Sequence, residues 1–125
     1  MAQQTTIKKG ITLKGKGLHT AHEAKVTFKP APKDTGLLFI RTDLPGRPPV
    51  RAEIANLLPE ERRSRRTSVG SGPAEIHTIE HILATVLGLG IDNLLIEIDN
   101  DEFPGEDGSS KNLAELLLKA GLEEQ

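Results

Sequence analysis

The sequence predicts an α+β fold, in which a mostly antiparallel sheet is covered on one face by two helices. Two observations lead to this class. The first part of the chain contains short segments with strand-like alternation, separated by turn residues. The second part contains two segments with helical periodicity and an apolar strand between them. Strands followed by helices are typical of the α+β class.

The predicted strands rest on alternation between apolar and polar residues. The segment 24–30 alternates most cleanly, because Ala24, Val26 and Phe28 fall on one face. This pattern is typical of a half-buried antiparallel strand. Weaker patterns predict further strands over residues 5–14, 37–42, 50–54 and 67–69. Glycine and proline turns separate them, including Gly15 and Gly17 after the first strand, so we expect an antiparallel meander.

Two predicted helices and one strand follow. Residues 76–88 carry an apolar stripe at helical spacing, made of Ile76, Ile79, Leu83, Val86 and Leu87. Gly88 and Gly90 are expected to end this helix. The near-continuous apolar run 93–98 predicts a strand. Residues 112–120 predict a second amphipathic helix, whose inward residues are Leu113, Leu116 and Leu117.

Composition limits the classes of protein to consider. A chain of 125 residues is the size of one domain, and its net charge of −2 does not favour a polyanionic partner. The absence of cysteine excludes disulfides, thiolate zinc sites and cysteine nucleophiles. No apolar run approaches the roughly 20 residues of a membrane span, and the amino terminus lacks the pattern of a signal peptide. We therefore expect a soluble cytoplasmic protein.

The segment from His77 to His81, His-Thr-Ile-Glu-His, carries the strongest chemical signal. On a helix, His77 and His81 would lie on one face and could hold a metal together. Glu80 could then accept a proton from a metal-bound water. The pattern matches the inverted motif of some zinc proteases, which also requires a third ligand downstream. The alternative is that Glu80 and His81 are surface residues at a helix amino terminus, where acidic residues are favoured.

A longer pattern around this segment is similar to a known family. Residues 76–84, followed by Leu-Gly-Leu-Gly-Ile-Asp-Asn at 87–93, resemble the signature of the UDP-3-O-acyl-N-acetylglucosamine deacetylases. Further agreement, in the same order, is found at residues 15–20, 30–36 and 41–44, at Glu102 and Pro104, and at residues 107–109. The similarity runs from about Lys9 to Gly121, and several motifs in register are more specific than any one alone.

The resemblance implies that residues 1–125 form a single domain, the first of two βααβ sandwich domains with the active site between them. It assigns His81 as one zinc ligand and Glu80 as the general base. The remaining zinc ligands would come from the second domain, which has no counterpart in this sequence. The substrate implied is a UDP-linked acyl-glucosamine of lipid A synthesis. The family pattern requires no ligand at His77, which we expect to face solvent or to cap the helix.

Three further features could have a role in the function. His19 follows a glycine-rich turn and could line the active-site cleft, although such a histidine is more often simply exposed. The loop 102–107 is more polar than in the resembled family, so we expect it to face solvent. Arginines cluster in the run 62–66, at Arg62, Arg63, Arg65 and Arg66. This run could meet a phosphate, but adjacent Glu60 and Glu61 and the lack of aromatic residues favour a solvated loop and no nucleic-acid partner.

Three hypotheses for function follow. The first is a domain of the deacetylase, inactive alone, which pairs with the second domain or with a second copy of itself. The second is a non-catalytic scaffold or self-associating module of the same fold. The third is an autonomous zinc hydrolase that uses His77, Glu80 and His81. Zinc content per chain distinguishes them, because only the third requires tight stoichiometric zinc in the chain alone.

Overall fold

The computed structural model describes residues 3–16, 23–52, 68–71, 74–104 and 111–125. In chain order the elements are β1 (Thr5–Ile7), β2 (Ile11–Lys16), β3 (Glu23–Pro30), β4 (Leu37–Arg41), β5 (Pro49–Arg51), β6 (Ser68–Ser71), β7 (Ala74–His77), α2 (Glu80–Leu89), β8 (Leu94–Ile98), α3 (Lys111–Ala120) and β9 (Leu122–Glu124). Mostly antiparallel sheets and the two helices among the described residues confirm the predicted α+β class.

The central sheet has five strands in the order β2-β3-β8-β4-β5. β8 pairs antiparallel with β3 and parallel with β4, so it lies between two strands that precede it in sequence. The expected simple meander is therefore wrong at this point. The physical reason is the apolar character of β8: Leu94, Ile96 and Ile98 are all fully buried, which suits the middle of a sheet better than an edge.

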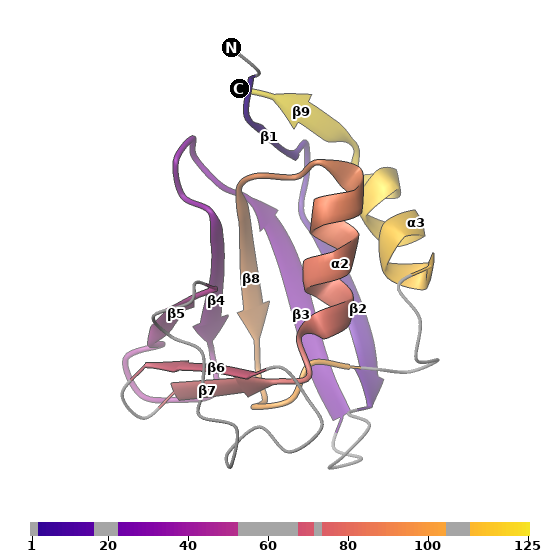
Figure 1. Cartoon of the computed structure of the whole chain (residues 1–125). Helices are drawn as coiled ribbons and strands as arrows, with labels where there is room; N and C mark the ends of the chain where they lie inside the picture. The colour runs from indigo at the N-terminus through magenta and orange to yellow at the C-terminus, as the bar shows by residue number, and fades with distance from the viewer. Residues whose placement is uncertain (1–2, 17–22, 53–67, 72–73, 105–110) are drawn as a thin grey trace.

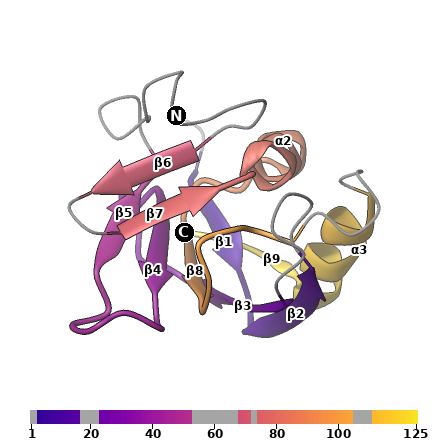
Figure 2. The ribbon, with the colours of Figure 1, turned by 90° about the horizontal axis from the view of Figure 1, so that it is seen from below.

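One face of the sheet is covered by α2, α3 and the β6–β7 hairpin, which together make the second layer (Figures 1 and 2). The core between the layers is aliphatic with three phenylalanines, all fully buried: Phe28, Phe39 and Phe103. The alternation predicted for β3 is confirmed, because Ala24, Val26 and Phe28 are buried while Lys25 and Lys29 are exposed. Neither described helix has the length and apolar character that a membrane span requires.

The helices differ in how well their buried faces were predicted. Leu113 and Leu117 of α3 are buried and Leu116 is half-buried, as expected. Leu87 of α2 was assigned to the buried stripe, but its side chain is 84% exposed. The buried residues of α2 are instead Ile82, Thr85 and Val86. Leu87 follows Val86 and is rotated about 100° away from it around the helix, which turns it toward solvent.

The single strand predicted over residues 5–14 is two strands. β1 leaves the central sheet and pairs with β9, a strand that the sequence did not predict. Gly121 ends α3 at a φ of 81°, so the chain turns directly into β9. Lys8 donates its backbone N–H to the Gly121 carbonyl at 2.9 Å, which closes the corner. The two ends of the chain therefore lie side by side (Figure 1). Gly15, expected in a turn, lies within β2.

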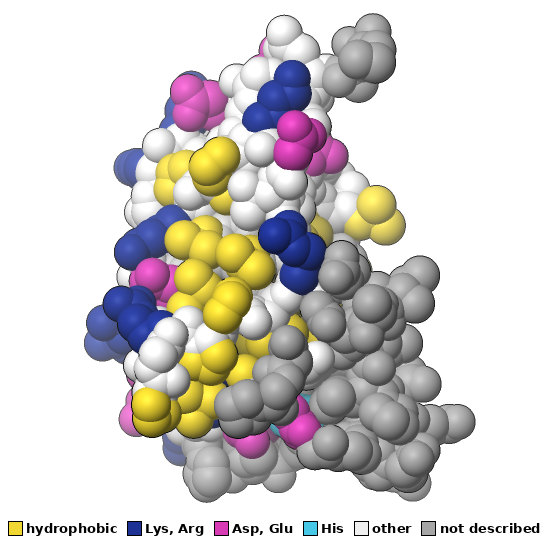
Figure 3. Space-filling view, turned by 90° about the vertical axis from the view of Figure 1, so that its left-hand side faces the viewer, with side chains coloured by type: hydrophobic (Ala, Val, Ile, Leu, Met, Phe, Trp, Pro, Cys, Tyr) yellow, Lys and Arg dark blue, Asp and Glu magenta, His cyan; other side chains and the backbone are white. Residues whose placement is uncertain are grey.

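The outer face of the sheet carries a mixed surface. Leu38 pairs with Leu95, and both are half-buried on the face opposite Phe39 and Ile96. Hydrophobic side chains gather on the side of the molecule where β4 and β5 lie, with charged side chains around them (Figure 3). Glu97 on this face forms ion pairs with Lys29 at 3.1 Å and Arg47 at 3.2 Å.

Candidate functional site

The segment with the strongest chemical signal lies where β7 turns into α2 (Figure 2). The predicted helix 76–88 actually begins at Glu80, and Ile76 and His77 belong to β7. Val69 of β6 pairs with Ile76, so these residues satisfy a strand ladder rather than a helical turn. Thr78, at a φ of 62°, then ends the strand.

This geometry separates His77 from the helix. His77 is 5% exposed, and its Nε2 lies 3.3 Å from Oε1 of Glu75. The expectation that His77 faces solvent or caps the helix is wrong, because the strand places its side chain in the interior. His77 lies in β7 and His81 in α2, so the two residues do not lie one turn apart on a single helix, which is the arrangement that the metal-binding interpretation required.

Glu80 and His81 are the first two residues of α2, and both are half-buried. Ile79 precedes them as the amino-terminal capping residue, is fully buried, and makes no side-chain capping hydrogen bond. The Leu83 N–H donates to the Ile79 carbonyl at 3.0 Å, and Thr85 Oγ1 donates to the His81 carbonyl at 2.7 Å. These hydrogen bonds, made with the buried residues Ile79 and Thr85, hold the backbone of this first turn.

A buried carboxylate stands behind this turn. Thr78 Oγ1 donates to Oε2 of Glu102 at 2.8 Å, and each residue is 1% exposed. Sequence reasoning missed this pair, because it expected the loop 102–107 to face solvent. That expectation is wrong for Glu102, Phe103 and Pro104, which are all buried, while the rest of the loop lies outside the described residues. The apolar residue Phe103 beside Glu102 was the available signal of burial.

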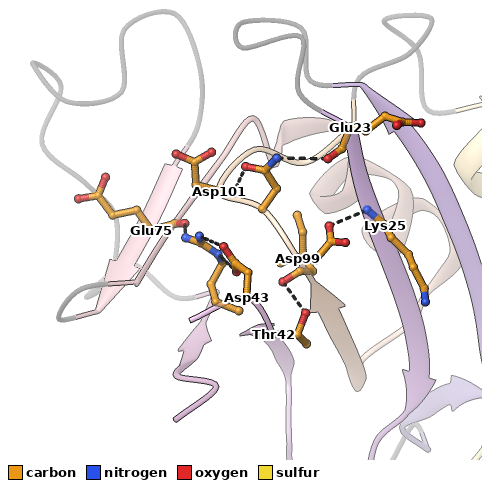
Figure 4. Close-up of polar contacts among 10 residues, drawn as sticks. Glu23, Lys25, Thr42, Asp43, Glu75, Asp99 and Asp101 are labelled. Carbon is orange, nitrogen blue, oxygen red and sulfur yellow. Dashed lines mark hydrogen bonds and ion pairs between the residues drawn. The ribbon is translucent and has the colours of Figure 1, made fainter. Parts of the chain in front are cut away.

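A buried arginine lies at the end of β4. The Arg41 guanidinium donates to both carboxylate oxygens of Asp43, at 2.9 and 2.7 Å, and to the Glu75 carbonyl at 2.8 Å (Figure 4). The Arg41 side chain is 8% exposed and that of Asp43 is 33% exposed. Hydrogen bonding from Arg41 lowers the pKa of the Asp43 carboxyl below its usual range, against the opposing effect of its partial burial. This pair ties β4 to β7.

An open hollow of about 210 Å³ lies near the ends of β2 and β3. It is lined by Lys14, Glu23, Ala24, Lys25 and Asp99. The Lys25 N–H donates to Asp99 Oδ1 at 2.8 Å, which fixes one wall (Figure 4). Neither Glu80 nor His81 lines this hollow.

Within the described residues, no group of three or more histidine, cysteine, aspartate or glutamate side chains is arranged to hold a metal ion. A catalytic zinc site uses three protein ligands and an open position, so the described residues do not form one on their own. His81 could supply one ligand. His19, His22 and the arginine run 62–66 lie outside the described residues.

Comparison with known proteins agrees with the resemblance seen in the sequence. Residues 4–125 match the family model of LpxC, UDP-3-O-acyl N-acetylglycosamine deacetylase. A bifunctional enzyme LpxC/FabZ of Chlorobaculum tepidum is 46% identical over 125 residues. A UDP-3-O-acyl-N-acetylglucosamine deacetylase of Bdellovibrio bacteriovorus is 42% identical over 125 residues, and one of Chromobacterium violaceum is 40% identical.

These matches cover the whole chain but only part of each relative. The chain spans 26% of the Chlorobaculum protein and 40% of the Bdellovibrio and Chromobacterium proteins. The similarity therefore extends to one portion of the longer proteins.

Proposed function

The chain belongs to the UDP-3-O-acyl N-acetylglycosamine deacetylase family, and from this we propose that it forms one domain of a zinc-dependent deacetylase. The substrate would be a UDP-linked acyl-glucosamine of lipid A synthesis, from which the enzyme releases acetate. The match of residues 4–125 to the family supports the proposal most directly. Relatives that carry this activity in their names support it further.

We assign two roles to residues at the start of α2. Glu80 accepts a proton from the water that attacks the acetamide, as a general base does. His81 supplies one imidazole ligand to zinc. Their positions support this assignment, because adjacent residues in the first turn of one helix are held in a fixed relation to each other.

The site requires a second polypeptide segment. Zinc, when bound, polarises the substrate carbonyl and makes water more acidic. The described residues supply His81 but no complete ligand set. The remaining ligands would come from the second deacetylase domain, or in part from a second copy of this chain. The domain by itself is accordingly expected to be inactive.

The proposal is tested in a chimera in which this chain replaces the matching segment of the Bdellovibrio deacetylase. The reason for this choice is the 42% identity across the whole chain. We expect the chimera to bind zinc and to release acetate from the UDP-linked substrate. Glu80→Ala should keep zinc and lower kcat by roughly a hundredfold or more, since it removes a general base. His81→Ala should lose zinc, measured as metal per chain after dialysis.

Glu115→Ala is the matched control, because Glu115 is an exposed glutamate on α3. It should leave both zinc content and kcat unchanged. A near-normal rate for Glu80→Ala would overturn the assignment of the base. A folded, zinc-loaded chimera with no turnover would favour the alternative, a non-catalytic scaffold or self-associating module of the same fold. The autonomous hydrolase using His77, Glu80 and His81 is disfavoured by the burial of His77 in β7.

A further inference from the structure

The turn between β7 and α2 contains only two residues, Thr78 and Ile79. Thr78 has a φ of 62°, in the left-handed region that β-branched residues rarely adopt. Ile79 has φ −99° and ψ 4° and is fully buried. The direction in which α2 leaves the strand is thus decided within two residues of Glu80. Such a backbone conformation persists only where surrounding contacts hold it.

The contact that acts on the Thr78 side chain is a hydrogen bond to Glu102. The hydroxyl donates to Oε2 at 2.8 Å, and both residues are 1% exposed. Shielding from water strengthens a hydrogen bond to a carboxylate and makes its loss costly. A β-branched side chain also has few rotamers, so the fixed hydroxyl restricts the backbone of Thr78.

The backbone on either side of Glu102 holds the same turn. His77 forms a parallel bridge with Glu102: the His77 N–H donates to the Asp101 carbonyl at 2.7 Å, and the Phe103 N–H donates to the His77 carbonyl at 2.9 Å. Phe103 is fully buried, and its ring lies 6.2 Å from that of Phe28 in the central sheet. The segment that carries Glu102 is therefore anchored to the core.

We propose that Thr78 and Glu102 are positioning residues for the reaction, and that their buried hydrogen bond sets where α2 begins and hence where Glu80 and His81 stand. This inference rests on the proposed function. Neither residue touches the substrate in this role. Both act through the turn that joins β7 to the helix.

The expected consequence is a defect in turnover rather than in binding. Catalytic groups must be held within a fraction of an ångström of their productive positions, and small misplacements reduce rates strongly. Without the Thr78 hydroxyl, the left-handed turn loses the side-chain contact that stabilises it. Glu80, two residues later, would then sample other positions, while substrate contacts made elsewhere would persist.

The first test compares Thr78→Val and Thr78→Ser in the active chimera. Valine keeps the branched shape and removes the hydroxyl, whereas serine keeps the hydroxyl. We expect Thr78→Val to lower kcat by roughly tenfold or more with KM and zinc content unchanged. Thr78→Ser should keep most of the wild-type kcat.

Thr6→Val is the matched control for loss of a buried threonine hydroxyl. Thr6 is 3% exposed and donates to the Asn93 carbonyl at 2.6 Å, in β1 rather than near α2. Its substitution should lower stability but leave kcat per folded chimera unchanged. Equal kcat for Thr78→Val and wild type would overturn the proposal, as would equal loss in Thr6→Val.

The second test asks whether Thr78 and Glu102 act through one hydrogen bond. Glu102→Met removes the acceptor with an apolar side chain of similar length. We expect the double variant with Thr78→Val to lose no more kcat than the worse single variant, because the partners share one interaction. Additive losses would show that the two residues act separately and would overturn the proposal.

A third measurement does not depend on activity. In the 125-residue chain, amide hydrogen exchange of residues 79–83 should quicken in Thr78→Val and stay at the wild-type rate in Thr6→Val, relative to exchange in β3. Unchanged exchange in Thr78→Val would contradict the positioning role even if the wild-type chimera is active. An inactive wild-type chimera with the expected exchange difference would contradict the proposed function and leave the role of the turn in place.

Discussion

At the scale of single residues, the ion pair between Arg41 and Asp43 should make the free energy of unfolding depend on pH in the acid range. The pKa of Asp43 is lowered in the folded protein by its hydrogen bonds from Arg41. The folded state then binds fewer protons than the unfolded state around that pKa, so the stabilisation is present above the unfolded pKa and is lost as pH falls through the folded one. Asp43→Asn should lower the free energy of unfolding by on the order of 1 kcal/mol at neutral pH, since the carboxylate is partly exposed.

Urea unfolding at pH 7 and at about pH 3 checks this prediction, because aspartate normally titrates near pH 4. The difference between wild type and Asp43→Asn should shrink at the lower pH. Glu123→Gln, which removes an exposed carboxylate from β9, serves as the control and should change little at either pH. A difference that does not depend on pH would contradict the charge-based origin of the effect.

Some positions of single residues could be predicted from the sequence and others could not. The motif around Glu80 and His81 was identified from the pattern, but the place of His77 was not. The spacing of apolar residues over a short segment does not distinguish a helix from a strand. Here the strand β7 ends at Thr78, whose backbone has a positive φ, and nothing in the sequence indicates that conformation. Glu102 was expected in solvent because the loop 102–107 is more polar than in the resembled family.

At the scale of elements, the segment after β8 is held to the sheet by Phe103. The ring is fully buried, its centroid lies 6.2 Å from that of the Phe28 ring, and the planes of the two rings meet at 55°. Phe103→Ala should lower the free energy of unfolding by about 3–5 kcal/mol, through lost burial and the cavity it leaves. Chemical denaturation monitored by circular dichroism measures this. Leu87→Ala, on the exposed side of α2, should change stability by less than about 0.5 kcal/mol.

A large effect of Leu87→Ala would mean that its side chain is covered in solution. The predicted apolar stripe is wrong at Leu87 because it was counted from Ile76, whereas the helix begins at Glu80.

β3 and α3 were predicted well because their patterns are local. The position of β8 between β3 and β4 was not, because strand partners are set by packing between residues far apart in sequence.

At the scale of the whole molecule, Asn93 joins three parts of the chain. It is 1% exposed; its Nδ2 donates to Gln4 at 2.8 Å and to Gln125 at 2.7 Å, and its Oδ1 accepts the Gly36 N–H at 2.8 Å. Asn93→Ala should lower the free energy of unfolding by about 2–4 kcal/mol, because its buried amide makes three hydrogen bonds that the variant loses. Thermal and urea unfolding measure the loss.

Asn100→Ala is the control, because Asn100 is only half-buried and donates to the Glu23 carbonyl at a longer 3.2 Å. It should cost clearly less than Asn93→Ala. Equal losses would show that Asn93 does not tie the chain ends together. No pattern in the sequence indicates this junction, because β1 and β9 have three residues each and their pairing spans the full chain.

The pairing of β1 with β9 also limits the reach of anything fused to the carboxyl end. A polypeptide joined after Gln125 departs beside the amino terminus, at the end of the molecule opposite the start of α2 (Figure 1). A helix of 10 residues is about 15 Å long, so that length separates the departing chain from the first turn of the helix. A donor of metal ligands joined there must therefore reach back over at least that length, through its connector or its own body, before it meets His81.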